Sequence, residues 1–169
     1  MGVPRLFSSL ELRSLHLRNR IVVSPMCQYK AVDGKVQDWH FRHHSRFALG
    51  GSALAFVEAT GVTAEGRITY GCTGIWDDYH IPGLKKIVEI YKSEGMAVGI
   101  QIGHAGRRAS AALPWHGALP LREDGVDSPW TRIGPSAIPE QEGYPAPRPM
   151  TDQDILEVVD AFSLATKRA

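Results

Sequence analysis

The sequence predicts an α/β fold built from parallel βα units, on the strength of three observations. Three apolar runs are typical of strands buried on both faces: "RIVVSPM" (20–26), "ALAFVEATGV" (53–62) and "MAVGIQIGHAG" (96–106). Helical segments over residues 39–51 and 82–95 lie between them. Continuous apolar strands that alternate with amphipathic helices indicate a parallel sheet.

The segment before the first strand predicts a small hairpin. In "LELRSLHLR" (10–18), leucines alternate with polar residues on both sides of Arg13 and Ser14. A period of two places the leucines on one face of a pair of strands. We therefore expect a hairpin with one buried face ahead of the first βα unit.

The first helical segment carries a stop signal, and the second carries both a start and a stop signal. Gly50 and Gly51 follow the first helix, and Pro82 and Gly95 stand near the two ends of the second. Helical spacing predicts a buried face on the second helix that contains Leu84, Ile87, Val88 and Tyr91. The side chains expected to face water are those of Lys85, Lys86, Glu89 and Lys92.

The pattern breaks over residues 108–150, which are rich in Pro, Gly and Trp and have no sustained period. A loop of this length is commonly functional, so we interpret it as an excursion on the side of the sheet that carries the site. Trp115 and Trp130 could pack a local mini-core within it or close over a ligand, and we favour the mini-core. Thr151 and Asp154 then form a capping-box pattern that opens a last helix. Its apolar face is predicted to contain Ile155, Val158, Val159 and Phe162.

Three strands of this kind do not close a sheet, because the outer two would keep unpaired edges. Further strands must come from another chain, or the 169 residues are the N-terminal part of a longer protein. We favour the second interpretation. Residues 1–169 are then one incomplete domain.

Composition and charge narrow the choice of partner. The chain carries 19 basic and 18 acidic residues, for a formal net charge of +1. This balance of charge does not indicate a basic surface that would bind nucleic acid or an anionic membrane. No stretch of uncharged residues is long enough to span a membrane. The expected partner is a small molecule. Cys27 and Cys72 are too few for a disulfide framework, which fits a reducing cytoplasm.

In parallel α/β folds the chemistry collects at the carboxyl ends of the strands. Small and polar residues stand at all three ends here, in "SPMCQY" (24–29), "EATG" (58–61) and "QIGHAGR" (101–107). Pro25 cannot donate to a sheet, so the first strand stops there. Small residues let a flat ligand approach the backbone. The Gln101 amide lies in an apolar strand, so we expect it to be buried and to need a hydrogen-bond partner, which a ligand could supply.

Each feature also has a purely structural explanation. A single cysteine such as Cys27 is more often an inert buried thiol than a reactive one. Tyr29 could be a rim aromatic whose hydroxyl reaches water. His104 and Arg107 could serve only to tie down the long loop.

The segment "WHFRHH" raises the question of a metal. His40 and His44 are four residues apart on a helix, a spacing that can bind zinc. No carboxylate stands between them in the arrangement of a zinc protease. We predict no metal site and interpret the segment as a helix N-terminus that faces water.

Taken together, these residues resemble the old yellow enzyme family of flavin-dependent oxidoreductases, and most closely its bacterial YqjM-like and xenobiotic-reductase-like branch. The motifs that carry the resemblance occur in family order and spacing over nearly the whole chain: "LRNRIVVSPMCQY", "VEATGVTAEGRIT", "GIWDDYHIPG", "GIQIGHAGRRAS" and "GPSAIP". The pair "SPMCQY" and "QIGHAGR" is specific to this branch.

The resemblance implies a (β/α)8 TIM barrel, with the hairpin closing its bottom and one FMN lying across the strand ends. The cofactor-binding residues that it implies are Ser24, Pro25, Met26, Cys27, Ala59 and Gln101. In this arrangement the Cys27 thiol lies near the flavin ring and tunes its reduction potential. The Ala59 backbone contacts the ring, and the Gln101 amide meets its polar pyrimidine edge. Tyr29 lines the substrate pocket.

The resemblance also implies the reaction of an ene-reductase. NADPH or NADH gives a hydride to FMN, and the reduced flavin passes a hydride to the β-carbon of an activated alkene such as an enone. The family's substrate-binding histidines, proton-donating tyrosine and phosphate site match nothing in this sequence. We expect them beyond Ala169, so no catalytic residue is assigned within the chain.

Two other interpretations stay open. The chain could be a catalytically inert half-barrel that folds by self-association, as a homo-oligomer, or it could need a complementing C-terminal half. A different flavin barrel, of the dihydroorotate dehydrogenase type, would share the fold and the cofactor. The motifs "SPMCQY" and "QIGHAGR" are not typical of that dehydrogenase type.

Overall fold

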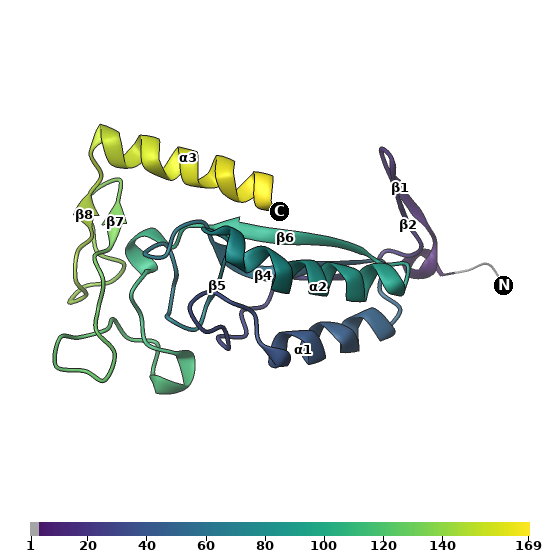
Figure 1. Ribbon diagram of the computed structural model, residues 1–169, viewed down its shortest axis with the longest axis horizontal. Coiled ribbons are helices and arrows are strands. Elements are labelled where there is room, and N and C mark those ends of the chain that lie inside the picture. Colours follow the sequence, from purple (N-terminus) through teal and green to yellow (C-terminus); the bar gives the residue numbers. More distant parts are fainter. Residues whose placement is uncertain (1–3) are drawn as a thin grey trace.

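The computed structural model describes residues 4–169, and a parallel sheet lies at its centre (Figure 1). β4 (Leu54–Gly61) pairs in parallel with β3 (Val22–Val23) and with β6 (Ala97–Gly103). The short strand β5 (Thr73–Gly74) pairs with the last two residues of β4. The three predicted strands are confirmed, although β3 is shorter than its apolar run. β5 has no apolar run and therefore no counterpart in the sequence prediction.

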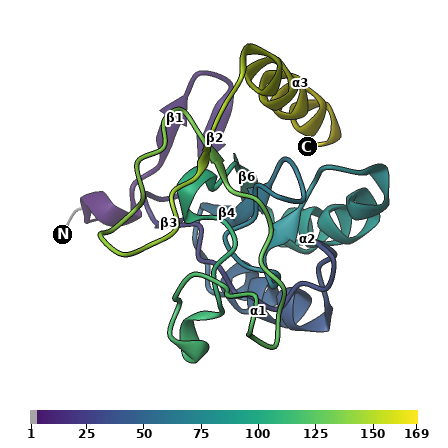
Figure 2. The same cartoon turned by 90° about the vertical axis from the view of Figure 1, so that its left-hand side faces the viewer.

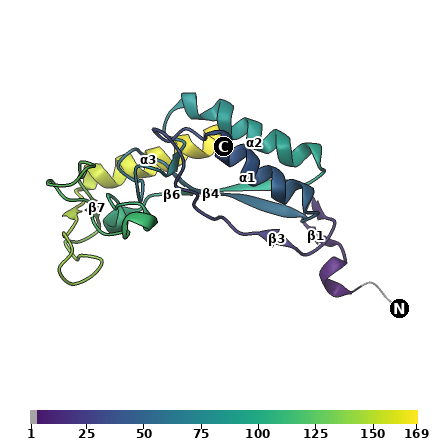
Figure 3. The same ribbon diagram turned by 90° about the horizontal axis from the view of Figure 1, so that it is seen from below.

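Two helices, α1 (Asp38–Leu49) and α2 (Ile81–Ser93), lie over the same face of the sheet (Figure 3). Both were expected, α1 from the glycines that close it and α2 from its spacing of apolar residues. Leu84, Ile87 and Tyr91 of α2 are buried, whereas the four side chains predicted to face water are exposed. The buried stripe of α2 is therefore confirmed.

The core lies between these helices and the sheet. Ala55 and Val57 of β4 face the helices and are 0% and 3% exposed, and Ile87 of α2 is 0% exposed. The Nδ1 atom of His44 on α1 lies 2.7 Å from the hydroxyl oxygen of Tyr91. This buried contact joins the two helices to each other above the sheet.

The prediction that "WHFRHH" faces water is wrong. His40, His43 and His44 are 0%, 8% and 3% exposed. His40 and His44 find polar partners at distant positions, Glu58 and Tyr91. A sequence window around α1 does not contain these partners, which is why the histidines looked too polar to be buried.

The hairpin forms as predicted from β1 (Leu10–Leu12) and β2 (Leu15–Leu17), at the opposite end of the sheet from the excursion (Figure 1). Leu17 is 2% exposed, but Leu12 and Leu15 are 48% and 39% exposed. The register pairs Leu12 with Leu15 next to the turn. The buried face is therefore confirmed only at the end away from the turn.

The second face of the sheet carries Phe56 and Gly99. A Cβ atom at Gly99 would lie 2.6 Å from the Phe56 ring, so the glycine makes room for that ring. Within residues 4–169, β3 and β6 each pair along one edge only, and the sheet stays open. The hairpin followed by three βα units is confirmed as an open α/β structure.

The last helix, α3 (Asp152–Arg168), begins at the predicted capping box. The Thr151 hydroxyl accepts a hydrogen bond from the Asp154 amide, and the Asp154 carboxylate accepts one from the Thr151 amide. The described residues cover its apolar face only in part, because Ile155 and Val159 are 48% and 59% exposed. No helix within residues 4–169 is both long and apolar enough to cross a membrane.

The excursion over residues 108–150 is anchored to the rest of the chain at the carboxyl edge of the sheet (Figure 2). It contains two very short parallel strands, β7 (Ile133–Gly134) and β8 (Arg148–Pro149). The buried Arg132 guanidinium donates hydrogen bonds to the carbonyl oxygens of Ala109 and Ser110, both at 2.6 Å. These charge-assisted bonds tie the start of the excursion to its middle.

The buried His44 predicts a loss of stability in mild acid. Burial lowers the pKa of His44 to about 4, whereas an exposed histidine in the unfolded chain has a pKa near ~6.5. Between these values the unfolded chain binds the proton and the folded chain does not, so protonation favours unfolding. We expect the free energy of unfolding to fall by ~3 kcal/mol from pH 7 to pH 4 through this group alone.

Urea denaturation between pH 4 and pH 7 measures this loss. His44→Gln keeps an acceptor for the Tyr91 hydroxyl and removes the titrating group, so its stability should decrease less over the same range. An equal decrease in both proteins would show that other groups are responsible.

Candidate functional site

The carboxyl ends of β3, β4 and β6 meet at one edge of the sheet, next to the excursion (Figure 2). A cavity of about 360 Å³ opens at this edge. Cys27, Ala59 and Gln101 all line it, and they come from the segment after β3, from β4 and from β6. The expected burial of Gln101 is wrong, because its side chain is exposed at this open edge. Other residues around the cavity are Gly61, Gly66, Arg67, Cys72, Gly103 and His104.

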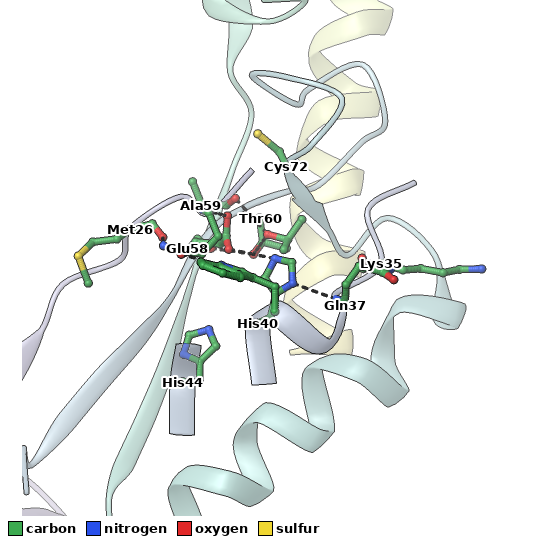
Figure 4. A network of polar contacts seen from close by, with 12 residues as sticks. Met26, Lys35, Gln37, His40, His44, Glu58, Ala59, Thr60 and Cys72 are labelled. Carbon is green, nitrogen blue, oxygen red and sulfur yellow. Dashed lines mark hydrogen bonds and ion pairs between the residues drawn. The ribbon is translucent and has the colours of Figure 1, made fainter. Parts of the chain in front are cut away.

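A β-bulge in β4 shapes one wall of the cavity. The register pairs Val57 with Ile100 and then Thr60 with Ile102, so β4 has one residue more than β6 in this interval. An inserted residue changes the face to which the following side chains point. As a result, Ala59 lines the cavity while Glu58 is 1% exposed and points toward α1 (Figure 4).

The remaining predicted site residues lie outside this cavity. Ser24 and Met26 are exposed, and Pro25 is partly exposed, along the extended chain that follows β3. Tyr29 lines a second cavity of about 270 Å³, together with residues of the excursion. Their contacts with a cofactor or substrate stay predictions, as do those of the three residues that the cavity brings together.

The backbone at Tyr29 adopts a left-handed conformation, with φ of 53°. A residue with a Cβ atom is strained there, and such strain persists where the surroundings fix it. Gly71 packs directly on the Tyr29 carbonyl, since a Cβ at Gly71 would lie 2.6 Å from that oxygen. The Tyr29 and Trp115 rings meet edge to face with centroids 6.2 Å apart.

The Cys27 thiol is protonated near neutral pH. Burial raises the pKa of Cys27 above its usual range, and Cys72 and Glu58 shift it further in the same direction. Burial likewise raises the pKa of Tyr29 to about 12. Both side chains are therefore neutral groups. Cys27 offers a soft, polarisable surface to a ligand rather than a nucleophilic thiolate.

His104 is a cavity residue for which the sequence suggested no more than a role in holding the loop. Its Nδ1 atom accepts a hydrogen bond from the Gly106 amide at 3.0 Å. Burial lowers the pKa of His104, so the ring is neutral and carries its proton on Nε2. In the described part of the chain that buried Nε2 atom has no hydrogen-bond partner. Its position directly after β6 was the available signal.

Arg67 was missed by the sequence analysis. Its guanidinium lies over the rings of Trp76, at 5.0 Å, and Trp130, at 5.5 Å. The Trp130 indole N–H also donates to the Glu65 carbonyl oxygen at 2.8 Å. The expected mini-core within the excursion is therefore wrong, because Trp115 and Trp130 contact residues outside it. A local sequence pattern cannot predict contacts between segments that are this distant in the sequence.

The histidines of α1 have polar partners within the protein. The Nδ1 atom of His40 accepts a hydrogen bond from the Gln37 amide at 2.9 Å, and His44 contacts Tyr91. Over residues 4–169, no group of three or more His, Cys, Asp or Glu side chains is placed to hold a metal ion.

Comparison with known proteins decides the family. Residues 5–169 match the NADH:flavin oxidoreductase / NADH oxidase family. The chain belongs to this family. It is the family of the old yellow enzymes, so the resemblance carried by the strand-end motifs is confirmed.

Relatives of this family are similar over almost all of the chain. An NADPH dehydrogenase of Geobacillus thermodenitrificans is 44% identical over 97% of this chain and 44% of its own length. Morphinone reductase superposes with a TM-score of 0.79 at 26% identity, over 98% of this chain and 45% of that one. An old yellow enzyme from Pichia sp. reaches 0.80 at 22% identity, over 97% and 42%. The chain therefore spans less than half the length of these relatives, and its open sheet corresponds to part of their TIM barrel.

The protonated Cys27 predicts slow alkylation at neutral pH. Iodoacetamide reacts with thiolates, and the raised pKa of Cys27 keeps its thiol protonated. The rate of alkylation of Cys27 should therefore rise steeply only at a higher pH than it does for a free cysteine. Mass spectrometry of the modified peptide measures the rate. Cys27→Ser is the control, because Cys72 is 2% exposed and should stay unmodified in the folded chain. Rapid alkylation of Cys27 at pH 7 would contradict the assignment of a neutral, partly buried thiol.

Proposed function

We propose that this chain is the N-terminal part of an FMN-dependent ene-reductase, which uses NADPH or NADH to reduce activated C=C bonds of α,β-unsaturated carbonyl compounds. The observation that carries the proposal is the convergence of Cys27, Ala59 and Gln101 on one cavity at the carboxyl edge of the sheet. The chain's membership of a flavin oxidoreductase family supports the choice of cofactor.

The cavity suits the flat ring of a flavin. Its volume of about 360 Å³ lies in the range of small-molecule sites, roughly 300 to 1,000 Å³. A Cβ atom at Gly103 would meet nothing within 4 Å, so the backbone is open there. The exposed Gln101 amide and the unpartnered Nε2 of His104 supply polar groups at the wall.

In the proposed complex the chain's own residues hold and orient the ring. Ser24, Pro25 and Met26 contribute the extended backbone after β3, and Ala59 contributes the backbone at the bulge. Gln101 hydrogen-bonds the pyrimidine edge, Cys27 lies near the ring, and Tyr29 lines the pocket for a small-molecule enone. Bound FMN supplies hydride transfer between the nicotinamide cofactor and the alkene.

The proton donor and the phosphate-binding groups belong to polypeptide beyond these 169 residues in this proposal, because the full-length relatives are more than twice as long. Residues 1–169 are then one part of a single FMN-binding barrel, completed by a C-terminal half. The exposed side chains of Ile155 and Val159 on α3 offer an apolar surface for such a half. The two free cysteines fit a cytoplasmic setting.

A second candidate is an inert half-barrel that associates with copies of itself. The same exposed face of α3 and the open edges of β3 and β6 favour it, since apolar surface and free strand edges promote association. This alternative predicts an oligomer that neither binds FMN nor oxidises NADPH.

Titration of the purified chain with FMN separates the two candidates. We expect saturable changes in flavin absorption and fluorescence, and about tenfold weaker binding for Gln101→Ala, which removes a hydrogen bond to the ring. Gln153→Ala, an exposed change on α3, should bind like the parent chain. Absence of saturable binding in the parent chain would overturn the proposed half-site and favour the inert oligomer.

A further inference from the structure

Glu58 is a buried carboxylate at the centre of the strand-end structure. It is 1% exposed and stands on the bulge of β4, directly before Ala59. Among the described residues, Nε2 of the His40 imidazole lies 3.4 Å from Oε1 of Glu58, and no Lys or Arg forms a salt bridge with this carboxylate. Burial of a carboxylate without a strong cation is costly, so the fold must use its acceptor atoms.

One carboxylate oxygen of Glu58 holds the segment that follows β3. Its Oε2 atom accepts a hydrogen bond from the backbone N–H of Gln28 at 2.8 Å. Gln28 directly follows Cys27, so this bond links the Cys27 segment to β4. The ladder between β3 and β4 itself covers only Val22 and Val23. Beyond these residues, the hydrogen bond between Gln28 and the Glu58 side chain connects the segment after β3 to β4.

The other carboxylate oxygen faces His40 on α1 (Figure 4). The Nδ1 atom of His40 accepts a hydrogen bond from the backbone N–H of Gln37, which places the ring proton on Nε2. Nε2 of His40 and Oε1 of Glu58 are both buried, and neither has a hydrogen-bond partner in the described chain. Their approach to 3.4 Å is a polar contact that orients the carboxylate toward α1.

We propose that Glu58 is a positioning residue for the strand-end cavity and that His40 orients its carboxylate. Glu58 then sets the placement of Cys27 through its hydrogen bond to the backbone N–H of Gln28. A carboxylate suits this position because one oxygen accepts the hydrogen bond from the backbone N–H of Gln28 while the other, also an acceptor, faces Nε2 of His40 at 3.4 Å. A carboxamide offers one acceptor and one donor, so it can satisfy only one of these two groups. The meaning of this role for cofactor binding rests on the proposed FMN site, but the role itself does not.

Amide hydrogen exchange at Gln28, followed by NMR, tests the proposal without any cofactor. Glu58→Ala should speed exchange at Gln28 by about ten- to hundredfold, the effect of losing a hydrogen bond to a charged acceptor. Glu58→Gln should give an intermediate rate. Glu89→Gln, an exposed change on α2, is the matched control and should have no effect. The amide of Ile87 in the core reports whether each variant is folded.

A second variant separates a specific pair from general damage. His40→Asn keeps a side-chain acceptor for the Gln37 amide and removes the Nε2–H donor. In that background Glu58→Gln should slow Gln28 exchange relative to the single Glu58→Gln variant, because its carbonyl oxygen is free to serve Gln28 alone. Additive effects of the two changes, or unchanged exchange at Gln28 in Glu58→Ala, would overturn the proposed role.

Binding of FMN to the same variants distinguishes this inference from the proposed function. Weaker FMN binding in Glu58→Ala with partial recovery in Glu58→Gln, in parallel with the exchange rates, would support both. If the parent chain binds no FMN while Gln28 exchange responds as expected, the flavin half-site fails and the positioning role stands. If FMN binds equally well to all variants, Glu58 does not position the cofactor residues and the proposal fails.

Discussion

The parallel pairing of β4 with both β3 and β6 is the constraint on which the rest of the structure depends. It aligns the three carboxyl ends at one edge, and it gives α1 and α2 a common face on which to bury their apolar stripes. Because parallel strands cannot be joined by tight turns, the connecting segments are long. The helices occupy one side, and the residues that form the cavity are left at the edge.

Much of this arrangement could be predicted from local patterns. The apolar run around Val57, the stripe through Ile87 and Tyr91, and the capping box at Thr151 each contain their signal within a few residues. The position of Gln101 at a strand end was sufficient to place it beside Cys27, because parallel strands share an edge. Periodicity, caps and chain order thus determine the elements and their approximate arrangement.

What could not be predicted depends on contacts between distant segments. The burial of His40 requires Glu58, and the stacking of Arg67 requires Trp130 from the excursion. The bulge in β4 is equally invisible in the sequence, since Glu58 reads as an ordinary residue of an apolar strand until its register with β6 is known. Side-chain polarity alone therefore predicts exposure wrongly wherever a distant partner compensates burial.

The order of β3, β4 and β6 in the sheet is also their order along the chain, with α1 between the first two and α2 between the last two. The chain segment between two of these paired strands is therefore no longer than one helical connection, and the entropic cost of bringing the two strands together is small. As the ribosome adds roughly 5 to 20 residues per second, β4 becomes available to β3 before β6 has been made. Of the three strand ends that line the cavity, those that carry Cys27 and Ala59 are therefore synthesised before the one that carries Gln101.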